Sequence, residues 1–317
     1  MSERRRCAVV GAGLLGLAAA WSMGRRGWDT VVFEAAAAPG HERSGSKGDA
    51  RIFRLGYPDA LYVEMAMLAR TAWRELEAAT GAHLLHVTGQ LTFGSELDAI
   101  AHALRACGVA AKALSRAEAA RRFPGVVPPG PVLFEPDSGV LAAGRCLDAL
   151  RSAGRIELCT KTDVVALEDD PGAAGVTVVL AGGARQRADV VVNCAGPRAL
   201  ALLAAPDSRP PPRAAAAPSL PQVAYFARRH PGAPLPPVFI EWGPTMIYGL
   251  PVPDDSGGLH AGTYKVSHHT PGTPFDPNDP DLSPLQDDAA LLARLTDAAG
   301  RLLPALDPAP VATERCV

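Results

Sequence analysis

The chain has 317 residues, 48% of them hydrophobic and 20% charged, which is ordinary for a globular protein large enough for two domains. Its formal net charge of −2 gives no electrostatic reason to expect nucleic acid or an anionic membrane as a partner. No apolar stretch is long enough to span a bilayer and no signal-peptide cleavage site follows the basic N-terminus, so we expect a cytoplasmic protein. The six cysteines show no Cys-x-x-Cys pair and no histidine in metal spacing, so we expect neither a disulfide framework nor a metal site.

The N-terminal part of the chain predicts a strand, a tight glycine turn, a helix and a second strand in succession. Apolar, largely β-branched residues at 7–10 and 30–34 flank an Ala/Leu-rich helix at 14–26. Residues 35–56 are rich in glycine, serine and charge and predict a loop, and a helix follows at about 61–80. The elements predicted beyond this point are strands at 84–87 and 90–93, helical pieces up to Arg122, a turn at 124–131, a helix at 144–153, strands at 156–158, 164–167, 176–180, 190–194, 222–226, 238–241 and 245–250, and a helix at 287–303.

The order of these elements predicts an α/β fold with two domains. The β-α-β units favour a nucleotide-binding domain, and the strand-rich segments favour a second domain built on a sheet. Residues 209–221 are almost all Pro, Ala and Arg, a composition typical of a linker.

A Gly-x-Gly-x-x-Gly motif follows the first predicted strand and opens the first helix, where residues 9–16 read Val-Val-Gly-Ala-Gly-Leu-Leu-Gly. Gly11 allows the tight turn, Gly13 lets the backbone approach a pyrophosphate, and Gly16 lets the helix pack closely on the strand. The helix N-terminus offers free N–H groups to the phosphates. Glu34 ends the second strand, where a carboxylate can bind the ribose hydroxyls. The motif predicts a dinucleotide site but fits FAD and NAD equally, and a glycine turn without a ligand is the alternative.

A resemblance to a known family favours FAD over NAD. Residues 44–54 read Ser-Gly-Ser-Lys-Gly-Asp-Ala-Arg-Ile-Phe-Arg, which resembles the Gly-x-x-Arg-x-x-Arg segment of the monomeric sarcosine oxidase and pipecolate oxidase family, within the D-amino-acid-oxidase-like flavoproteins. Further similar blocks occur in family order at 88–94, 122–125, 134–141, 190–197, 247–251, 264–269 and 314–316. Because these blocks cover nearly the whole chain, the resemblance is more specific than any single motif.

The resemblance assigns roles to two arginines and a lysine. Arg54 corresponds to the arginine that binds the substrate carboxylate, and Arg51 to the one beside the flavin ring. A planar guanidinium with five donors suits a carboxylate, although two solvated surface arginines are the alternative. Lys265 resembles the lysine that activates oxygen, because a cation near the reduced flavin stabilises the charge that oxygen gains. A strand lysine reaching toward solvent is the alternative for Lys265, and His260 could be mistaken for the matching position.

Other site residues follow from the same resemblance. His269 and Tyr248 match residues that line the substrate pocket, although packing roles are as consistent with the sequence. Cys316 matches the cysteine that carries the flavin through an 8α thioether, with Arg315 as a neighbouring cation that favours the thiolate; a free cysteine near a frayed end is the alternative. Lys47 departs from the family, whose members commonly have histidine there. The implied cofactor-binding residues are Gly11, Gly13, Leu14, Leu15, Gly16, Glu34, Ser46, Lys47, Arg51, Val164, Ala195, Gly196 and Cys316.

The implied architecture is an α/β fold with a Rossmann-like FAD-binding domain and a second, antiparallel-sheet substrate domain. The first would consist of residues 1–82 and 142–215, and the second of residues 83–141 and 216–317. Family members continue for several dozen residues beyond the position of Val317. We therefore expect a truncated or incomplete version of a longer oxidase, with a sheet edge or a hydrophobic face left uncovered.

The implied reaction is the oxidation of a small secondary amino acid, either N-methylated or cyclic, such as sarcosine or pipecolate. A hydride would pass to flavin N5 and molecular oxygen would reoxidise the flavin, giving hydrogen peroxide. A flavin dehydrogenase with another acceptor and an NAD-dependent enzyme are alternatives among enzymes. A non-catalytic flavin-binding remnant is the alternative from another class.

Overall fold

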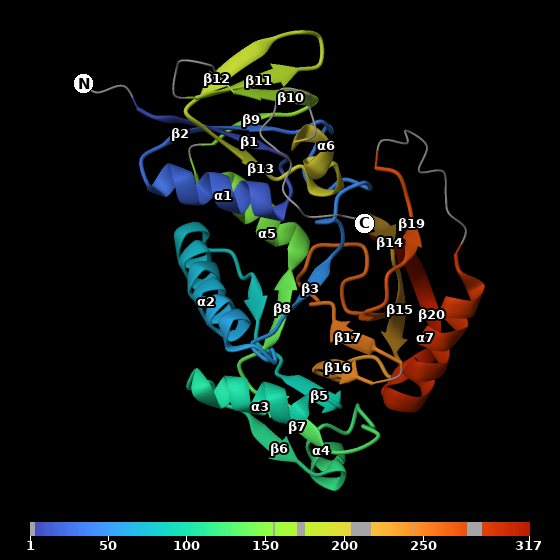
Figure 1. Ribbon diagram of the computed structural model, residues 1–317. Coiled ribbons are helices and arrows are strands. Elements are labelled where there is room, and N and C mark those ends of the chain that lie inside the picture. The colour runs from blue at the N-terminus through green and yellow to red at the C-terminus, as the bar shows by residue number, and fades with distance from the viewer. Residues whose placement is uncertain (1–3, 155, 170–174, 204–216, 244, 278–286) are drawn as a thin grey trace.

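The computed structural model describes residues 4–154, 156–169, 175–203, 217–243, 245–277 and 287–317. Most of the predicted linker at 209–221 lies outside the described residues. In Figure 1 a parallel sheet with its covering helices lies in the upper part of the molecule, and a larger sheet lies below it.

The parallel sheet has four strands in the order β13-β1-β2-β9. These are β1 (Arg6–Val10), β2 (Asp29–Phe33), β9 (Ile156–Cys159) and β13 (Val190–Asn193). Both faces of this sheet are covered, which explains why its strands are almost continuously apolar. Cys7 and Val9 point into a core shared with α1 (Leu14–Arg25) and α5 (Ala143–Ser152).

The opposite face of the parallel sheet packs on a small antiparallel sheet. Ala8 and Val10 belong to a second cluster with buried residues of this sheet, among them Val178. Its strands, in the order β10-β11-β12, are β10 (Val164–Asp169), β11 (Val176–Leu180) and β12 (Arg185–Ala188). Successive residues of β1 therefore face different layers, as the two-residue period of a strand requires.

The large sheet has eight strands in the order β20-β15-β18-β17-β16-β5-β7-β6, and all neighbouring pairs except β16 and β5 are antiparallel. One face packs on α7 (Ala289–Leu302). The strands are β5 (Gln90–Gly94), β6 (Lys112–Leu114), β7 (Val132–Glu135), β15 (Gln222–Arg228), β16 (Val238–Trp242), β17 (Ile247–Pro251), β18 (Tyr264–His268) and β20 (Leu306–Arg315).

A three-stranded sheet in the order β3-β8-β4 lies between these two parts, as Figure 1 shows. Its strands are β3 (Ala50–Phe53), β8 (Gly139–Ala142) and β4 (Leu85–His86). Because Arg51 lies within β3, this sheet places the arginine segment beside the large sheet. The remaining elements are α2 (Ala60–Thr80), α3 (Leu97–Ala106), α4 (Arg116–Arg122), the 3-10 turn Gly196–Arg198, α6 (Ala199–Leu203), and the short paired strands β14 (Ser219–Leu220) and β19 (Thr273–Pro274).

The predicted fold class is confirmed: the chain combines a parallel α/β layer with antiparallel sheets. The predicted loop at 35–56 is partly wrong, because residues 50–53 form β3 by pairing with the distant β8. The sequence analysis also missed β6, β7, β8, β12 and β20. Strand β20 contains Pro308 and Pro310, which argue against a central strand, but it lies at the sheet edge within the described chain, where proline is tolerated. The proposed domain boundaries remain a prediction.

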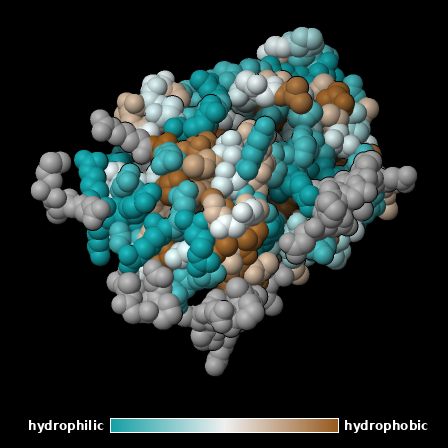
Figure 2. Space-filling model, turned by 90° about the horizontal axis from the view of Figure 1, so that it is seen from above, coloured by the Kyte–Doolittle hydropathy of each residue, from teal (hydrophilic) through white to brown (hydrophobic). Residues whose placement is uncertain are grey.

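No helix in the described ranges is long and apolar enough to cross a membrane. Figure 2 shows the face seen from above, where apolar groups form several separate patches between polar ones. Scattered exposed apolar residues of this kind are normal for a protein surface.

Candidate functional site

A cavity of about 1090 Å³ lies where the parallel sheet meets α1. Its wall includes Gly11 and Gly13 from the glycine turn and Glu34 at the end of β2. The carboxyl ends of parallel strands and the N-terminus of the following helix meet at this edge, which is where α/β folds bind nucleotides. We call this space the nucleotide cavity.

The glycine turn is tightly packed at two of its three glycines. Gly11 has a φ of +95°, and a Cβ there would lie 2.4 Å from the carbonyl oxygen of Cys194. A Cβ on Gly16 would lie 1.8 Å from the carbonyl oxygen of Gly11, so only glycine allows α1 to approach β1 this closely. Gly13 lines the cavity, and the N–H of Leu14 donates to Ser46 Oγ at 2.8 Å. The start of α1 thus presents its positive end to the cavity.

Glu34 is buried at the carboxyl end of β2. Its Oε2 accepts from the N–H of Ala12 at 2.9 Å, and its Oε1 accepts from the N–H of Ala36 at 2.9 Å. His41 Nε2 lies 3.6 Å from Oε1 of Glu34. These contacts hold the carboxylate against the glycine turn, at the cavity wall.

The nucleotide cavity brings together most of the predicted cofactor-binding residues. Those that line it are Gly11, Gly13, Leu14, Leu15, Glu34, Ser46, Val164, Ala195 and Gly196. Gly16 lies behind the turn and packs instead of lining the cavity. Lys47, the departure from the family pattern, lines neither this cavity nor the neighbouring one and pairs with Glu42.

A second cavity, of about 320 Å³, adjoins the first, and Gly45 and Val317 line both. The two spaces can therefore hold one elongated ligand. The smaller space, which we call the substrate-side cavity, is lined by residues distant in sequence: Arg51, Arg54, Tyr248, Lys265, His269 and Cys316. All of the predicted catalytic residues and the predicted flavin-carrying cysteine thus meet in one place.

The two arginines of this cavity have different surroundings. Arg51 donates to the backbone carbonyls of Ala50 at 3.0 Å, Gly45 at 3.1 Å and Lys47, so its guanidinium is fixed by the loop before β3. Arg54 stacks 4.2 Å from the ring centroid of Tyr57 and 5.4 Å from that of Trp242. No carboxylate within the described ranges forms an ion pair with Arg54, so its charge stays available to an anion.

Lys265 is a buried cation in the wall of the substrate-side cavity. Its Nζ lies 5.8 Å from the centroid of the Tyr225 ring. Burial and the nearby Arg51 charge lower the pKa of Lys265 to about 8. The lysine therefore remains mostly protonated at pH 7 and loses its charge at moderately alkaline pH.

His269 directly follows β18, and its ring contacts two aromatic side chains. Its ring stacks on Trp242 with centroids 5.3 Å apart and lies 4.7 Å from the ring of Tyr248. Burial and the charge of Arg54 lower the pKa of His269 to about 4, so its imidazole is neutral at neutral pH. Burial raises the pKa of Tyr248, which keeps that hydroxyl protonated.

Cys316 follows β20 and is half-buried in the same wall. Its N–H donates to the carbonyl of Pro221 at 2.9 Å, and its side chain packs against the buried cluster that includes Val223 and Leu250. Arg315, expected to favour the thiolate, does not line the cavity and donates to the carbonyl of Leu220 at 3.2 Å. Arg51 and Arg54 are the arginines that share the cavity with Cys316.

Comparison with known proteins shows which family the chain belongs to. The family model described as FAD dependent oxidoreductase (DAO) matches residues 6–316. The chain belongs to this family. It is 30% identical to human peroxisomal sarcosine oxidase over 98% of this chain and 79% of that relative. It is 33% identical to the monomeric sarcosine oxidase of Bacillus sp. (strain B-0618) over 48% of this chain and 40% of that relative.

Solved structures agree with the family assignment. The open form of NikD, described as an unusual amino acid oxidase essential for nikkomycin biosynthesis, superposes with a TM-score of 0.80 at 25% identity, covering 98% of this chain and 81% of that chain. Glycine oxidase from Geobacillus kaustophilus superposes with a TM-score of 0.73 at 20% identity, covering 98% of this chain and 82% of that chain. The second likeness shows the shared fold.

The residues present fit the FAD of this family. A backbone surface without side chains at Gly11 and Gly13, the N-terminus of α1 and the carboxylate of Glu34 suit the pyrophosphate and ribose of the nucleotide. The adjoining substrate-side cavity lies where the rest of an extended cofactor would reach. The aromatic and cationic wall of that cavity suits a planar ring system that gains negative charge when it is reduced.

The sequence analysis missed a polar group behind Lys265. The hydroxyl of Tyr225 donates to Glu314 Oε2 at 2.7 Å, and His260 Nε2 lies 3.4 Å from Glu314 Oε1. The ring of His260 stacks on that of Tyr225 with centroids 3.8 Å apart. Burial raises the pKa of Glu314, but the Tyr225 hydrogen bond and nearby cations outweigh it, so the net shift is downward. The sequence feature that could have indicated this group is Glu314, two residues before Cys316. Its partners could not be predicted, because they come from β15 and the 252–263 loop.

Proposed function

We propose that the chain is an FAD-dependent oxidase of a small secondary amino acid, N-methylated or cyclic, which yields hydrogen peroxide. The observation that carries this proposal is the substrate-side cavity, where Arg54, which forms no ion pair with the described residues, the neutral His269 and the buried cation Lys265 line one space. The names of the relatives support the substrate class, since two are sarcosine oxidases.

Arg54 would bind the carboxylate of the substrate. Its guanidinium lies over the rings of Tyr57 and Trp242, and a planar guanidinium can contact a carboxylate with two parallel hydrogen bonds. The same aromatic rings provide apolar walls for an N-methyl group or a saturated ring. A cavity of about 320 Å³ favours a small amino acid over a peptide.

His269 would bind the substrate amine as a neutral hydrogen-bond acceptor. Because the pKa of His269 is about 4, its imidazole carries no charge that would repel an ammonium group or compete with Arg54. The imidazole would accept a hydrogen bond from an N–H of the amine, which favours the orientation with that N–H directed at His269. Tyr248, whose pKa is raised by burial, would pack on the opposite side as a neutral aromatic wall.

Bound FAD would supply the redox chemistry by taking a hydride from the carbon next to nitrogen and returning the electrons to oxygen. Lys265 would hold a positive charge beside the place where oxygen gains negative charge, and its buried position spares the reorganisation that water would require. Arg51 would hold the ring-side wall through its backbone contacts.

We further propose that Cys316 carries the cofactor covalently. The thiol would lose its proton and the 8α methyl carbon one C–H hydrogen as the S–C bond forms, and oxygen would take the two electrons and two protons released, giving hydrogen peroxide. The shared cavity with Arg51 supports this, because a guanidinium stabilises a thiolate. The predicted domain division and the cytoplasmic location remain proposals beside this one.

Peroxide release from the flavin-loaded chain tests the proposed activity. We expect peroxide with one or more of sarcosine, other N-methyl amino acids, L-pipecolate and L-proline, and much less with glycine and L-alanine as matched primary amines. Flavin content is measured first, so that a loading failure is distinguished from a lack of turnover. Loaded protein that is inactive toward every secondary amine, or that prefers the primary amines, would refute the proposal.

A further inference from the structure

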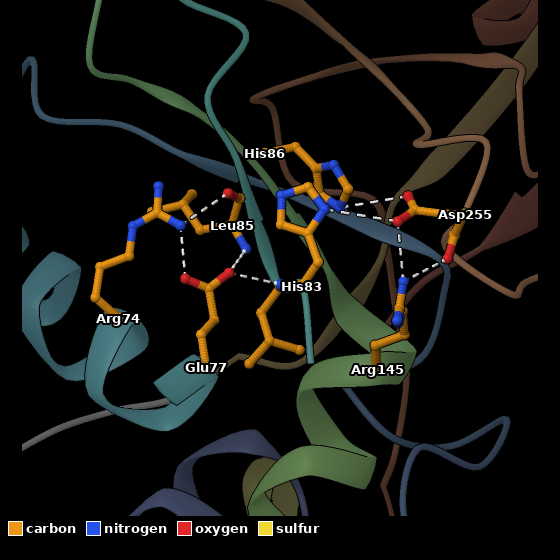
Figure 3. Close-up of polar contacts among 8 residues, drawn as sticks. Arg74, Glu77, His83, Leu85, His86, Arg145 and Asp255 are labelled. Carbon is orange, nitrogen blue, oxygen red and sulfur yellow. Dashed lines mark hydrogen bonds and ion pairs between the residues drawn. The ribbon is translucent and has the colours of Figure 1, made fainter. Parts of the chain in front are cut away.

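Two histidines and an aspartate from distant parts of the chain meet on the surface away from both cavities. His83 and His86 precede and end β4, and Asp255 lies in the loop after β17. Figure 3 shows the three side chains converging, with Arg145 of α5 also contacting Asp255. One ligand atom from each of His83, His86 and Asp255 lies within 4.8 Å of the other two.

The distances between these donor atoms fit a shared metal ion. His83 Nδ1 lies 3.6 Å from Asp255 Oδ2, and His86 Nε2 lies 3.5 Å from Asp255 Oδ1. A tetrahedral ion with bonds of about 2.0–2.1 Å separates its donors by about 3.3 Å. Each observed separation involves a different oxygen of Asp255 and is slightly longer than this value, so a small rotation of the carboxylate would let one ion bind all three groups. Both separations are also longer than ordinary hydrogen bonds. His86 Nε2 is also buried and has no hydrogen-bond partner within the described chain.

The histidine segment is held in place by α2, which ends at Gly81. The carboxylate of Glu77 accepts from the N–H groups of Leu84 at 2.7 Å and Leu85 at 3.0 Å. Arg74 donates to Glu77 Oε2 at 2.6 Å, as Figure 3 shows. The backbone between the two histidines is therefore fixed before any ligand arrives, which reduces the entropy lost on binding.

The charges around the cluster predict moderate affinity for a metal ion. Arg145 donates to the Asp255 carbonyl at 2.9 Å and to Oδ2 at 3.0 Å, which orients the carboxylate but places a positive charge nearby. Oδ1 stays directed at His86.

We propose that His83, His86 and Asp255 form a binding site for a divalent transition-metal ion of the zinc type. Imidazole nitrogens with one carboxylate suit zinc, and three protein ligands leave one position for water. The ion would fasten the 252–263 loop to β4. Since the N–H of His260, in the same loop, donates to Asp49 Oδ2 at 2.7 Å, the site would also brace the segment leading to Arg51. The expectation of no metal site, drawn from the spacing of the cysteines, left out this group because Asp255 is remote from the two histidines in the chain.

Calorimetric titration of zinc chloride into the chelator-treated full chain tests this site. We expect one zinc ion per chain, and binding at least about tenfold weaker in His83→Ala and Asp255→Asn. His83 is the cleaner variant, because its side chain is 57% exposed and its removal leaves the core intact. His102→Ala, an exposed histidine on α3, is the matched control and should bind zinc as the unmodified chain does.

Thermal unfolding gives a second measurement that does not depend on enzyme activity. Zinc should raise the melting temperature of the unmodified chain and of His102→Ala, and should have little effect on His83→Ala. Absence of saturable zinc binding at millimolar concentrations, or equal binding by His83→Ala and the control, would overturn the proposal. The contacts would then be His–Asp–Arg ion pairs alone.

Discussion

The nucleotide cavity and the substrate-side cavity are built from different kinds of sequence information. The glycine wall of the nucleotide cavity is backbone within one β-α-β unit, where Gly11 and Gly16 permit close packing. The substrate-side cavity gathers side chains from β3, β16, β17, β18 and the residues after β20. The nucleotide cavity depends on positions without side chains, whereas the substrate-side cavity depends on charged side chains. Substitutions should therefore act through shape in one cavity and through electrostatics in the other.

The largest effect should come from shape, in Gly16→Ala. The new Cβ would lie 1.8 Å from the carbonyl oxygen of Gly11, so α1 must move away from β1. We expect loss of most flavin binding and a decrease of about 3 kcal/mol in the free energy of unfolding. Flavin content and denaturant unfolding measure the two. Gly24→Ala in the same helix is the control, since no atom lies within 4 Å of its added Cβ, and it should stabilise the chain by up to about 1 kcal/mol. Wild-type flavin content in Gly16→Ala would contradict the claim that substitutions in the nucleotide cavity act through shape.

Charge should dominate at Arg54. Arg54→Ala removes the cation proposed to bind the substrate carboxylate, and we expect kcat/KM to fall about a hundredfold, a loss of about 3 kcal/mol, mainly through KM. Steady-state peroxide kinetics measure this. Arg301→Ala, which removes an exposed arginine paired with Asp297, should leave both constants unchanged. An unchanged KM in Arg54→Ala would assign substrate binding to another group.

Lys265→Met separates the two half-reactions. The substitution keeps the length of the side chain and removes its charge, so reoxidation by oxygen should slow about a hundredfold while reduction by substrate stays nearly unchanged. Stopped-flow spectroscopy follows each half-reaction. Slowing of both half-reactions to the same extent would indicate a structural role for the lysine instead.

The pKa of Lys265 gives a pH dependence with a definite sign. Because burial and Arg51 lower this pKa to about 8, raising the pH through that value removes the positive charge. The rate of reoxidation should therefore be high below pH 8 and should fall above it. In Lys265→Met this fall should disappear. A rate that rises through the same range would contradict the assignment.

The smallest effect on turnover should come from Cys316→Ser. The protein should still bind FAD in the nucleotide cavity but should release it on acid precipitation, whereas the unmodified chain retains it. Cys107→Ser, a half-buried cysteine outside both cavities, is the control. Release of the flavin by acid from both variants and from the unmodified chain would show that the attachment is not covalent.

The same comparison shows what could be predicted from sequence. The first β-α-β unit was predicted nearly to the residue, because the strand, turn and helix signals are local. Strand β3 was not, since residues 50–53 end a stretch rich in glycine, serine and charge and form a strand by pairing with the distant β8. Strand β20 was hidden by two prolines that only an edge position accommodates. The substrate-side residues came from a family resemblance, and no spacing in the sequence would place Arg51 beside Cys316.

Anaerobic addition of substrate to the flavin-loaded chain tests the central claim most directly, because it needs no oxygen and reports on the two cavities together. If one ligand extends through both and Arg54 orients the substrate beside it, the flavin absorbance should bleach with a secondary amino acid and should persist in Arg54→Ala at the same concentration. Flavin that stays oxidised with every secondary amino acid, or that bleaches equally in Arg54→Ala, would contradict the account.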